Sequence, residues 1–518
     1  MEKTRAESSG VPAVRKLRTL RFVAALLAAA SALAVFFCSS HWFPHIPHTP
    51  NHCPLSKPPH DGPLYPENRA RYQSIFAESF PRSEALVALA TSSRSGRLES
   101  DMELGGWRTS SNVLYLLGGE FTISDAVILL EGSGGGAESL NITLFLPNQT
   151  ERETIFMGGF PRPKVLRAEF GVKDVKAMAD FASYVKGKQV LTTSKDELAK
   201  AIRQDLDIVE ESAELQQVFI QARFVKSKRE LAQLEYASRV ASWAHKIIAR
   251  HIKYGRHVNE LALASLFEHL STLCGARLQA YPAIVGAGGH AAVLHYRTGE
   301  NVTAGYAPID SGALVLVDAA GEYGGYASDL TRTWARSGKW TKKTKALHAA
   351  VMRAQQAAID AFEEGVETSV VIDAAYRSLL KSLIHMRFFV EGHSVDELLE
   401  AGVLYVFMPH GLGHPVGLDV HDPVPSKYEL SKVARLIPSF VTQVAPPTNF
   451  KIFRGYAATL EPGLYLIPGL LAQIKSDPTG LGRFINWDVV DKLADVGGVR
   501  NEDVVIITHS GKKVIITR

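Results

Sequence analysis

Two aspartates on either side of a glycine-rich turn are the residues with the clearest capacity for chemistry. Residues 314–334 (LVLVDAAGEYGGYASDLTRTW) run through apolar side chains to Asp318, turn, and return to Asp329. Apolar and β-branched runs that flank a glycine turn predict a β-hairpin. With one aspartate on each arm, we expect both carboxylates on one side, where they repel each other unless a cation compensates them. The alternative is a pair of exposed strand aspartates.

A group of histidines follows about ninety positions later in the chain. His410 and His414 are separated by Gly-Leu-Gly, and His421 lies in the next motif, GLDVHD. Glycines between histidines allow the backbone to approach a site closely, and histidine is the commonest metal ligand among neutral side chains. A single core histidine is usually satisfied by the backbone, but three within twelve residues predict a functional site.

Two glutamates complete the set of candidate ligands. Glu461 ends an apolar strand in AATLEPGLYL, and Glu502 begins one in NEDVVIIT. Together with the aspartates and His414 they supply four carboxylates and one imidazole, which suits two divalent cations. Oxygen-rich ligation favours hard ions such as Mn²⁺, Mg²⁺ or Ca²⁺. The remaining polar residues, left to bind substrate and move protons, are His295, His410, His421 and Arg500.

The elements that must position these residues divide into two folded parts. Residues 64–215 alternate apolar runs with helical stretches and predict an α/β domain. Its expected strands are 113–117, 125–130 and 142–147, and its expected helices are 174–186 and 195–203. No catalytic group stands out in this part of the sequence.

Residues 216–518 predict an α+β domain that carries the candidate site. A capping box at Ser227–Glu230 opens a helix whose inward residues are Leu231, Leu234 and Ala241. A second helix is expected over 259–274, and further helices over 343–364 and 367–386. Two helices followed by strands, twice over, suggest a duplicated α+β half.

The N-terminus has the pattern of a secretory or membrane-anchoring segment. A basic tail, residues 1–21, precedes an uncharged apolar run, residues 22–38, which is at the short end of what spans a bilayer. Basic residues before the run favour a type II orientation with the rest of the chain in the lumen or outside the cell. Cleavage near Ala34, giving a secreted protein, is the alternative. Residues 39–63 are rich in proline and histidine and predict an extended linker.

The composition excludes several classes of protein. With 46% hydrophobic and 21% charged residues and a net charge of +4, the chain is typical of a globular protein and does not suggest a nucleic-acid binder. Three cysteines, Cys38, Cys53 and Cys274, are too few and too scattered to predict a disulfide framework, and we expect unpaired thiols. In a lumenal protein, three sequons are candidate glycosylation sites: Asn141, Asn148 and Asn301.

Four stretches closely resemble the prolidase and aminopeptidase P family of metallopeptidases. They are VDAAGEYGGYASDLTR, VFMPHGLGHPVGLDVHD, LEPGLYLI and GGVRNEDVVIIT. The resemblance covers about 64–518 and is densest from 223 onward. It implies a "pita-bread" catalytic domain of duplicated α+β halves behind a smaller creatinase-like N-terminal domain. It also implies a homodimer and two divalent ions, with Mn²⁺ as the expected metal.

The resemblance implies roles for individual residues. The implied metal ligands are Asp318, Asp329, His414, Glu461 and Glu502. Glu461 is also the implied general acid and base, and His421 would stabilise the tetrahedral intermediate. The other implied substrate-contacting residues are His295, His410, Tyr281 and Arg500. The implied reaction is hydrolysis of a peptide bond to proline, in dipeptides or longer peptides.

The sequence departs from the family pattern at three places. His290 replaces a usual asparagine, Pro415 follows His414, and residues 423–458 look unlike the family, with no clear counterpart of the arginine that binds a dipeptide carboxylate. Lys451 and Arg454 are the candidates for that role. An Xaa-Pro dipeptidase is the favoured prediction. The alternatives are an Xaa-Pro aminopeptidase and a non-catalytic family member that binds partners.

Overall fold

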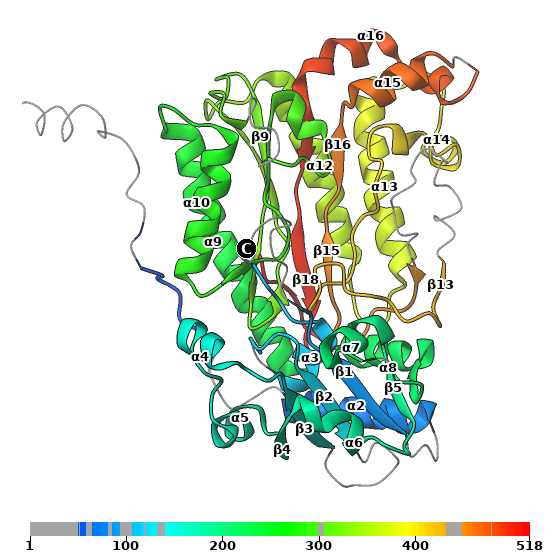
Figure 1. Ribbon diagram of the computed structural model, residues 1–518. Helices are drawn as coiled ribbons and strands as arrows, with labels where there is room; N and C mark the ends of the chain where they lie inside the picture. Colours follow the sequence, from blue (N-terminus) through cyan, green and yellow to red (C-terminus); the bar gives the residue numbers. More distant parts are fainter. Residues whose placement is uncertain are drawn as a thin grey trace, which may run out of the picture. The chain divides into compact units, whose positions relative to one another are not determined.

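The computed structural model describes most of the chain from position 50 onward (Figure 1). The described residues are 50, 52–57, 65–80, 85–93, 106–118, 121–131, 140–204, 206–298, 305–430, 448–477 and 479–518. Apart from Tyr254–Arg256 they belong to one unit, which contains every contact given below. The expected basic tail and apolar segment, 1–21 and 22–38, lie outside the described residues. Within the described ranges, no helix is both long enough and apolar enough to cross a membrane.

A six-stranded mixed sheet with the order β4-β3-β2-β1-β5-β6 forms the centre of the N-terminal part. Its strands are β1 (Leu86–Ala90), β2 (Val127–Glu131), β3 (Asn141–Leu146), β4 (Asp174–Ala177), β5 (Val190–Thr192) and β6 (Val209–Glu211). Alternate residues of β1 pack on opposite faces: Val87 joins Phe219 of α8, whereas Ala88 joins Leu198 of α7. Helices therefore cover both faces, which explains why the strands are apolar throughout.

The helices of this part are α2 (Tyr65–Ser79), α3 (Ser111–Leu117), α4 (Glu151–Met157), α5 (Pro163–Phe170), α6 (Phe181–Tyr184), α7 (Lys195–Ile202) and α8 (Ala213–Phe224). The predicted strands at 125–130 and 142–147 are confirmed as β2 and β3, and the helix at 195–203 is confirmed as α7.

Two predictions in this part are wrong. The expected strand at 113–117 is the helix α3, all seven residues of which are buried. A short, wholly apolar run fits a buried helix as well as a buried strand, so periodicity could not distinguish them. The expected helix at 174–186 begins with strand β4, which pairs with β3 at the sheet edge, and continues as a 3₁₀ turn and the short α6.

The second part begins with the long helix α9 (Lys228–Tyr254), opened by the predicted capping box. Ser227 Oγ accepts from the backbone N–H of Glu230, whose carboxylate accepts from the Ser227 N–H. The inward residues Leu231, Leu234 and Ala241 are buried as expected. The predicted second helix is α10 (Glu260–Leu273), capped by Asn259.

Two sets of helices and antiparallel strands follow one another, as the sequence suggested. In Figure 1, α9 and α10 lie beside β9, and α12 and α13 lie beside β15, β16 and β18. The three-stranded sheets have the orders β12-β9-β8, β11-β10-β7 and β15-β18-β19, and the two-stranded sheets are β16-β17 and β13-β14. The helices after α10 are α12 (Lys342–Ala361), α13 (Thr368–His385), α14 (Val395–Glu400), α15 (Pro468–Lys475) and α16 (Trp487–Val490), together with the 3₁₀ helices η2 (Gly288–Ala292), η3 (Val403–Val406), η5 (Leu481–Phe484) and η6 (Asp491–Val496).

The strands of the first set are β7 (Leu278–Gln279), β8 (Ile284–Ala287), β9 (Leu314–Asp318), β10 (Gly321–Tyr323), β11 (Tyr326–Ala327) and β12 (Thr331–Ala335). Those of the second are β13 (Glu429–Leu430), β14 (Thr448–Asn449), β15 (Ala457–Leu460), β16 (Gly463–Tyr465), β17 (Gly498–Arg500), β18 (Asp503–Ile507) and β19 (Lys513–Ile515). The register places Asp318 opposite Thr331, and Leu460 opposite Asp503. The candidate carboxylates therefore lie at strand ends, where backbone pairing fixes their positions.

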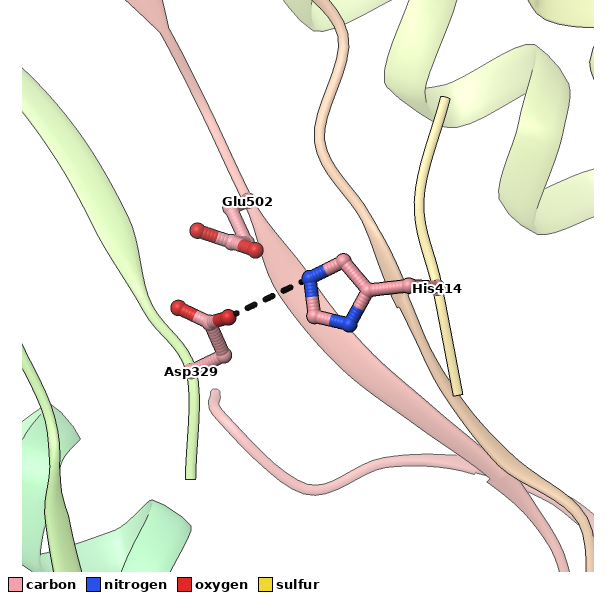
Figure 2. A group of neighbouring side chains, drawn as sticks. All are labelled: Asp329, His414 and Glu502. Atoms are coloured by element: carbon pink, nitrogen blue, oxygen red, sulfur yellow. Dashed lines mark ion pairs between the residues drawn. The ribbon is translucent and has the colours of Figure 1, made fainter. Parts of the chain in front are cut away.

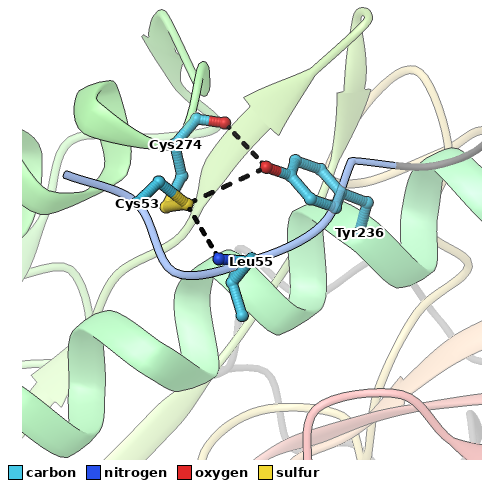
Figure 3. Close-up of a disulfide and its surroundings, with 4 residues drawn as sticks. All are labelled: Cys53, Leu55, Tyr236 and Cys274. Carbon is cyan, nitrogen blue, oxygen red and sulfur yellow. Dashed lines mark hydrogen bonds between the residues drawn. A yellow bond between two sulfur atoms is a disulfide. The ribbon is translucent and has the colours of Figure 1, made fainter.

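A disulfide corrects the expectation of unpaired thiols. Cys53 is bonded to Cys274, 221 positions away, at the end of α10 (Figure 3). Tyr236 of α9 donates a hydrogen bond to the Cys274 carbonyl, and the Leu55 N–H lies 3.4 Å from the Cys53 sulfur. Sequence spacing gave no sign of this pairing, because the two cysteines become neighbours only when residues 52–57 return to the α9–α10 pair.

Candidate metal centre

Asp318 and Asp329 meet at one hydroxyl. Asp318 is the last residue of β9, and Asp329 lies two positions before the first residue of β12. The Tyr281 hydroxyl oxygen lies 2.6 Å from Oδ1 of each carboxylate. A hydroxyl carries one proton and can donate to only one acceptor at a time. The two aspartates therefore face each other with fewer donors than they need, as expected for ligands of a cation.

Glu502 is held by Thr331, the first residue of β12. Thr331 Oγ1 donates to Glu502 Oε2 over 2.7 Å and accepts from Arg500 Nε over 3.1 Å. Arg500 also donates from Nη2 to Asp318 Oδ2 over 2.5 Å. Because Arg500 ends β17 and Glu502 precedes β18, their side chains reach the aspartates through strand positions that the sheet determines.

His414 and Glu461 approach the aspartates from the second half. His414 Nε2 lies 3.4 Å from Asp329 Oδ2 and 3.4 Å from Glu461 Oε1. The His414 backbone pairs with that of Thr459 at the end of β15, and a Cβ on Gly413 would come within 2.0 Å of the Thr459 carbonyl oxygen. Glycine is thus required beside His414, because any side chain there would push the loop away from the strand.

Potential ligand atoms of Asp329, His414 and Glu502 all lie within 4.8 Å of one another. Figure 2 shows the three side chains pointing toward one centre from separate parts of the chain. All five predicted ligands are therefore brought together: Asp318, Asp329, His414, Glu461 and Glu502.

Burial of this much charge shifts the protonation of the cluster. Burial raises the pKa of Glu461 to about 7 and raises those of Glu502 and Asp318 as well. Burial opposes protonation of His414, but its hydrogen bond to Asp329 and the charge of Glu461 prevail and raise its pKa to about 9. Glu461, Glu502 and Asp318 thus hold protons more tightly, and His414 becomes a cation, in place of the positive charge that the cluster lacks.

The donor set fits divalent cations. Asp318, Asp329 and Glu502 expose 8%, 5% and 1% of their surface, so their charges are not offset by water. Four carboxylates and one imidazole, with no thiolate, form a set that suits hard or borderline ions bound through oxygen. Buried carboxylates without enough donors are costly unless a cation pairs with them.

His410 lies in a chain of hydrogen bonds that reaches the aspartates. Arg500 Nη1 donates to the Tyr465 hydroxyl over 2.9 Å, so Tyr465 has its own proton for His410 Nε2, also at 2.9 Å. His410 Nδ1 lies 2.7 Å from the Gly411 carbonyl and is therefore the protonated nitrogen. Burial and the charge of Arg500 lower the His410 pKa to about 3, consistent with this neutral form. Both ring nitrogens are engaged, which leaves neither free for a substrate in this arrangement.

The other two histidines are exposed. The His421 ring lies 4.1 Å from the His414 ring, centre to centre. His295 follows η2, and its charge contributes, after burial and Arg500, to lowering the His410 pKa. His295 and His421 therefore lie near the cluster and are exposed to solvent.

Thr331 and Tyr465 were missed by the sequence analysis. Thr331 lies two positions after Asp329, and Tyr465 four after Glu461. The two-residue period of an extended chain could have placed the side chains of Thr331 and Asp329 on one face. Tyr465, in an apolar run, gave no comparable sign.

The remaining predicted sites are placed as follows. Asn148 is exposed, Asn141 is partly buried at the start of β3, and Asn301 lies outside the described residues. Lys451 is exposed, whereas Arg454 forms an ion pair with Glu364 over 2.8 Å.

The two parts of the fold match two different protein-family models. Residues 65–195 match the aminopeptidase P N-terminal domain, and residues 232–509 match metallopeptidase family M24, a family that uses divalent metals. The chain belongs to metallopeptidase family M24. The predicted family is thereby confirmed, as is the peptidase class.

Among curated M24 relatives, the Xaa-Pro dipeptidase of Homo sapiens is 31% identical over 72% of this chain and 76% of its own length. A probable Xaa-Pro aminopeptidase of Fusarium vanettenii is 30% identical over 85% and 90%, respectively. Pseudomonas aeruginosa aminopeptidase PepP has a similar structure, with a TM-score of 0.68, 24% identity, and coverage of 89% of this chain and 96% of that one. The predicted two-domain α+β fold is confirmed by this similarity.

Proposed function

We propose that this M24 peptidase hydrolyses peptide bonds whose nitrogen belongs to proline, as an Xaa-Pro dipeptidase. The observation that carries the proposal is the convergence of Asp318, Asp329, His414, Glu461 and Glu502 on one buried centre. The names of the curated relatives supply the substrate class: Xaa-Pro dipeptidase and Xaa-Pro aminopeptidase.

The five ligands would hold two divalent ions, and we propose Mn²⁺ because oxygen donors outnumber the single imidazole and no thiolate is present. When bound, the ions would lower the pKa of a water molecule and polarise the substrate carbonyl. The surrounding chain serves this chemistry by keeping the carboxylates fixed through Tyr281, Thr331 and Arg500.

Glu461 has the properties of a general acid and base. Its carboxylate, deprotonated when the ions are bound, would accept a proton from the attacking water and return it to the proline nitrogen. His421, exposed beside His414, would donate a hydrogen bond to the carbonyl oxygen as negative charge develops there. His295, also exposed, would contact the substrate near the scissile bond.

An Xaa-Pro aminopeptidase is the second candidate, and one observation favours it. A dipeptidase needs a cation for the free carboxylate that follows proline, but Arg454 is already paired with Glu364. Lys451 remains as a candidate on the exposed strand connection after β14. The choice between these functions depends on whether the protein recognises the free carboxylate of the substrate's proline.

Hydrolysis by the full-length protein with Mn²⁺ separates the candidates. An Xaa-Pro dipeptide and an Xaa-Pro-Xaa tripeptide are compared, with Glu502→Gln as the inactive control. Cleavage of the dipeptide alone would support an Xaa-Pro dipeptidase, and cleavage of the tripeptide an aminopeptidase. If neither is cleaved while metal binding is demonstrated, the proposed function is wrong and a non-catalytic role is favoured.

We also propose that the described part of the chain lies in the lumen of the secretory pathway or outside the cell, behind an anchor at residues 22–38. The Cys53–Cys274 disulfide supports this location, because disulfides persist in oxidising compartments. Glycosidase treatment tests it: a mass shift that is lost in Asn148→Gln is expected, and a chain without glycan and with both thiols free would contradict it.

A homodimer is the proposed assembly. Three adjacent apolar side chains of α4, Ile155, Phe156 and Met157, expose 72%, 78% and 63% of their surface. Exposed apolar groups of this kind mark contact surfaces. Light scattering of the purified protein is expected to give twice the chain mass, and Phe156→Ser should shift it toward the monomer.

A further inference from the structure

His421 is placed by its backbone. Among the described residues, none forms a hydrogen bond with the His421 ring; its recorded partner is the His414 ring, packed against it at 4.1 Å. The surrounding segment, Pro415–Asp422, closes on itself, because the Asp422 N–H donates to the Pro415 carbonyl and the Gly417 N–H to the Asp419 carbonyl, each over 3.0 Å. Whatever holds this segment therefore decides where the His421 side chain points.

Asp422, the next residue, is the anchor of the segment. Its Oδ1 accepts from Arg223 Nη2 over 2.6 Å, and its Oδ2 from Lys226 Nζ over 2.9 Å. The side chains of Asp422 and Lys226 expose 1% each, and that of Arg223 exposes 6%. A second contact keeps the geometry tight, since Asp422 Oδ1 lies 3.4 Å from the Asp419 N–H. Buried, paired charges of this kind specify one arrangement more than they add stability.

The N-terminal domain reaches the same segment. Ser111 Oγ, at the start of α3, donates to Asp419 Oδ1 over 2.5 Å, and Arg108 Nη2 donates to the Leu418 carbonyl over 2.5 Å. Asn112 Oδ1 accepts from Arg223 Nη1 over 3.1 Å, which links α3 to the ion pair with Asp422. Arg223 itself also bonds Asp419. A single network thus runs from the N-terminal domain, through the end of α8, to the residue beside His421.

We propose that Asp422, held by Arg223 and Lys226, is a positioning residue for His421, and that Ser111 of the N-terminal domain takes part in this positioning. The inference rests on the proposed function, in which His421 donates to the reacting carbonyl oxygen. Displacing a catalytic group by about 1 Å can cost on the order of a hundredfold in rate. The N-terminal domain would then act on catalysis through the loop that it contacts.

Steady-state kinetics of the full-length protein with Mn²⁺ and an Xaa-Pro peptide test the proposal. Asp422→Asn keeps the side chain's shape but removes its charge, and we expect kcat to fall by about 10–100-fold with KM nearly unchanged. Ser111→Ala, a milder change on the other domain, should lower kcat several-fold. The matched control is Glu230→Gln, a buried carboxylate that pairs with Arg71 and accepts from Tyr326 but does not contact residues 415–422; it should leave the kcat/KM split unchanged.

A second measurement does not depend on activity. Histidine labelled with ¹³C at Cε1 gives one signal per ring in the metal-free protein, and His421→Gln assigns the signal of interest. We expect this signal to move in Asp422→Asn and in Ser111→Ala, but not in Glu230→Gln. If Asp422→Asn lowers only the melting temperature, with the signal and kcat unchanged, the network is purely structural and the proposal is overturned.

The two kinds of result separate this inference from the proposed function. A wild-type protein without Xaa-Pro hydrolysis contradicts the function, while the His421 signal still reports whether Asp422 positions the ring. An active wild type with unaltered variants contradicts the positioning role alone. If Asp422→Asn does not fold, Ser111→Ala decides the question, because it removes one hydroxyl and leaves the buried ion pairs intact.

Discussion

The two sides of the carboxylate cluster differ in how firmly the protein holds them. On one side, Asp318 accepts from Tyr281 and Arg500, and Arg500 also bonds Thr331 and Tyr465, all over 2.5–3.1 Å. On the other side, His414 Nε2 lies 3.4 Å from the carboxylates of Asp329 and Glu461. Among the described residues, the Glu461 carboxylate has one further side-chain contact, with Thr459 Oγ1 at 3.4 Å. One side is preformed by hydrogen bonds, and the other is held chiefly by charge.

This difference indicates what a metal ion would change. On the preformed side, the arginine supplies a positive charge whether or not metal is bound. On the other side, protonated His414, with its pKa raised to about 9, stands in for that charge. Metal binding must therefore replace protons at His414, Glu461 and Glu502, whereas Asp318 keeps its hydrogen-bond partners.

The largest effect is expected at Glu502, which faces both sides. Its Oε2 accepts from Thr331 on the preformed side, and its carboxylate lies with the His414 imidazole and the Asp329 carboxylate around the common centre. Glu502→Gln keeps the hydrogen bond but removes the charge, so metal-dependent hydrolysis should fall on the order of a thousandfold or more. Circular dichroism and thermal melting should remain close to wild type. Retained activity in this folded variant would contradict the two-metal account.

A smaller loss, about 10–100-fold in metal affinity or activity, is expected for Thr331→Val. Valine has nearly the same shape but cannot donate to Glu502 or accept from Arg500, so the preformed side loses its central hydroxyl. The matched variant Thr459→Val removes the long contact with Glu461 on the other side and should cost less. Metal titration followed by calorimetry compares the two, and a larger loss in Thr459→Val would reverse the comparison.

The preformed side was also the easier one to predict in part. The pairing of Asp318 with Asp329 was predicted from an apolar run, a glycine turn and a second run, because a β-hairpin has a recognisable local sequence pattern. The hydrogen bonds that make this side rigid were not predicted. The contact of Thr331 with Glu502 joins residues 171 positions apart, and no local pattern reports such a distance.

Errors in the fold prediction have the same physical origin. Helix α3 was predicted as a strand because all of its residues are buried, which removes the polar face that would reveal its period. Residue 174 begins the edge strand β4, which forms because it pairs with β3. This tertiary pairing is not encoded in the local pattern of residues 174–186. The helices α12 and α13 were predicted within a few residues of both ends, and the start of α9 was predicted from its capping box.

The pH dependence of metal binding tests the charge-held side directly. His414 titrates at about pH 9 and Glu461 at about pH 7 in the metal-free protein, and a bound ion requires both to be deprotonated. Affinity should therefore weaken as pH falls below about 9, by about tenfold per pH unit for each proton displaced. Calorimetry in buffers of different ionisation enthalpy counts the protons. His410→Asn is the control, because His410 is already neutral, and an affinity independent of pH from 9 to 6 would contradict the assignment.

The smallest effect on hydrolysis is expected from the Cys53–Cys274 disulfide, which lies outside both sides of the cluster. Cys53→Ser releases residues 52–57 from the end of α10, and closing a loop this long typically stabilises a fold by about 2–4 kcal/mol. The melting temperature should therefore fall while kcat and KM stay the same below it. Reduction of the wild type should reproduce this, and Cys53→Ser should show no further response to reductant. A loss of activity in the folded variant would mean that the cluster depends on residues 52–57, and that its positions are not set by the strands alone.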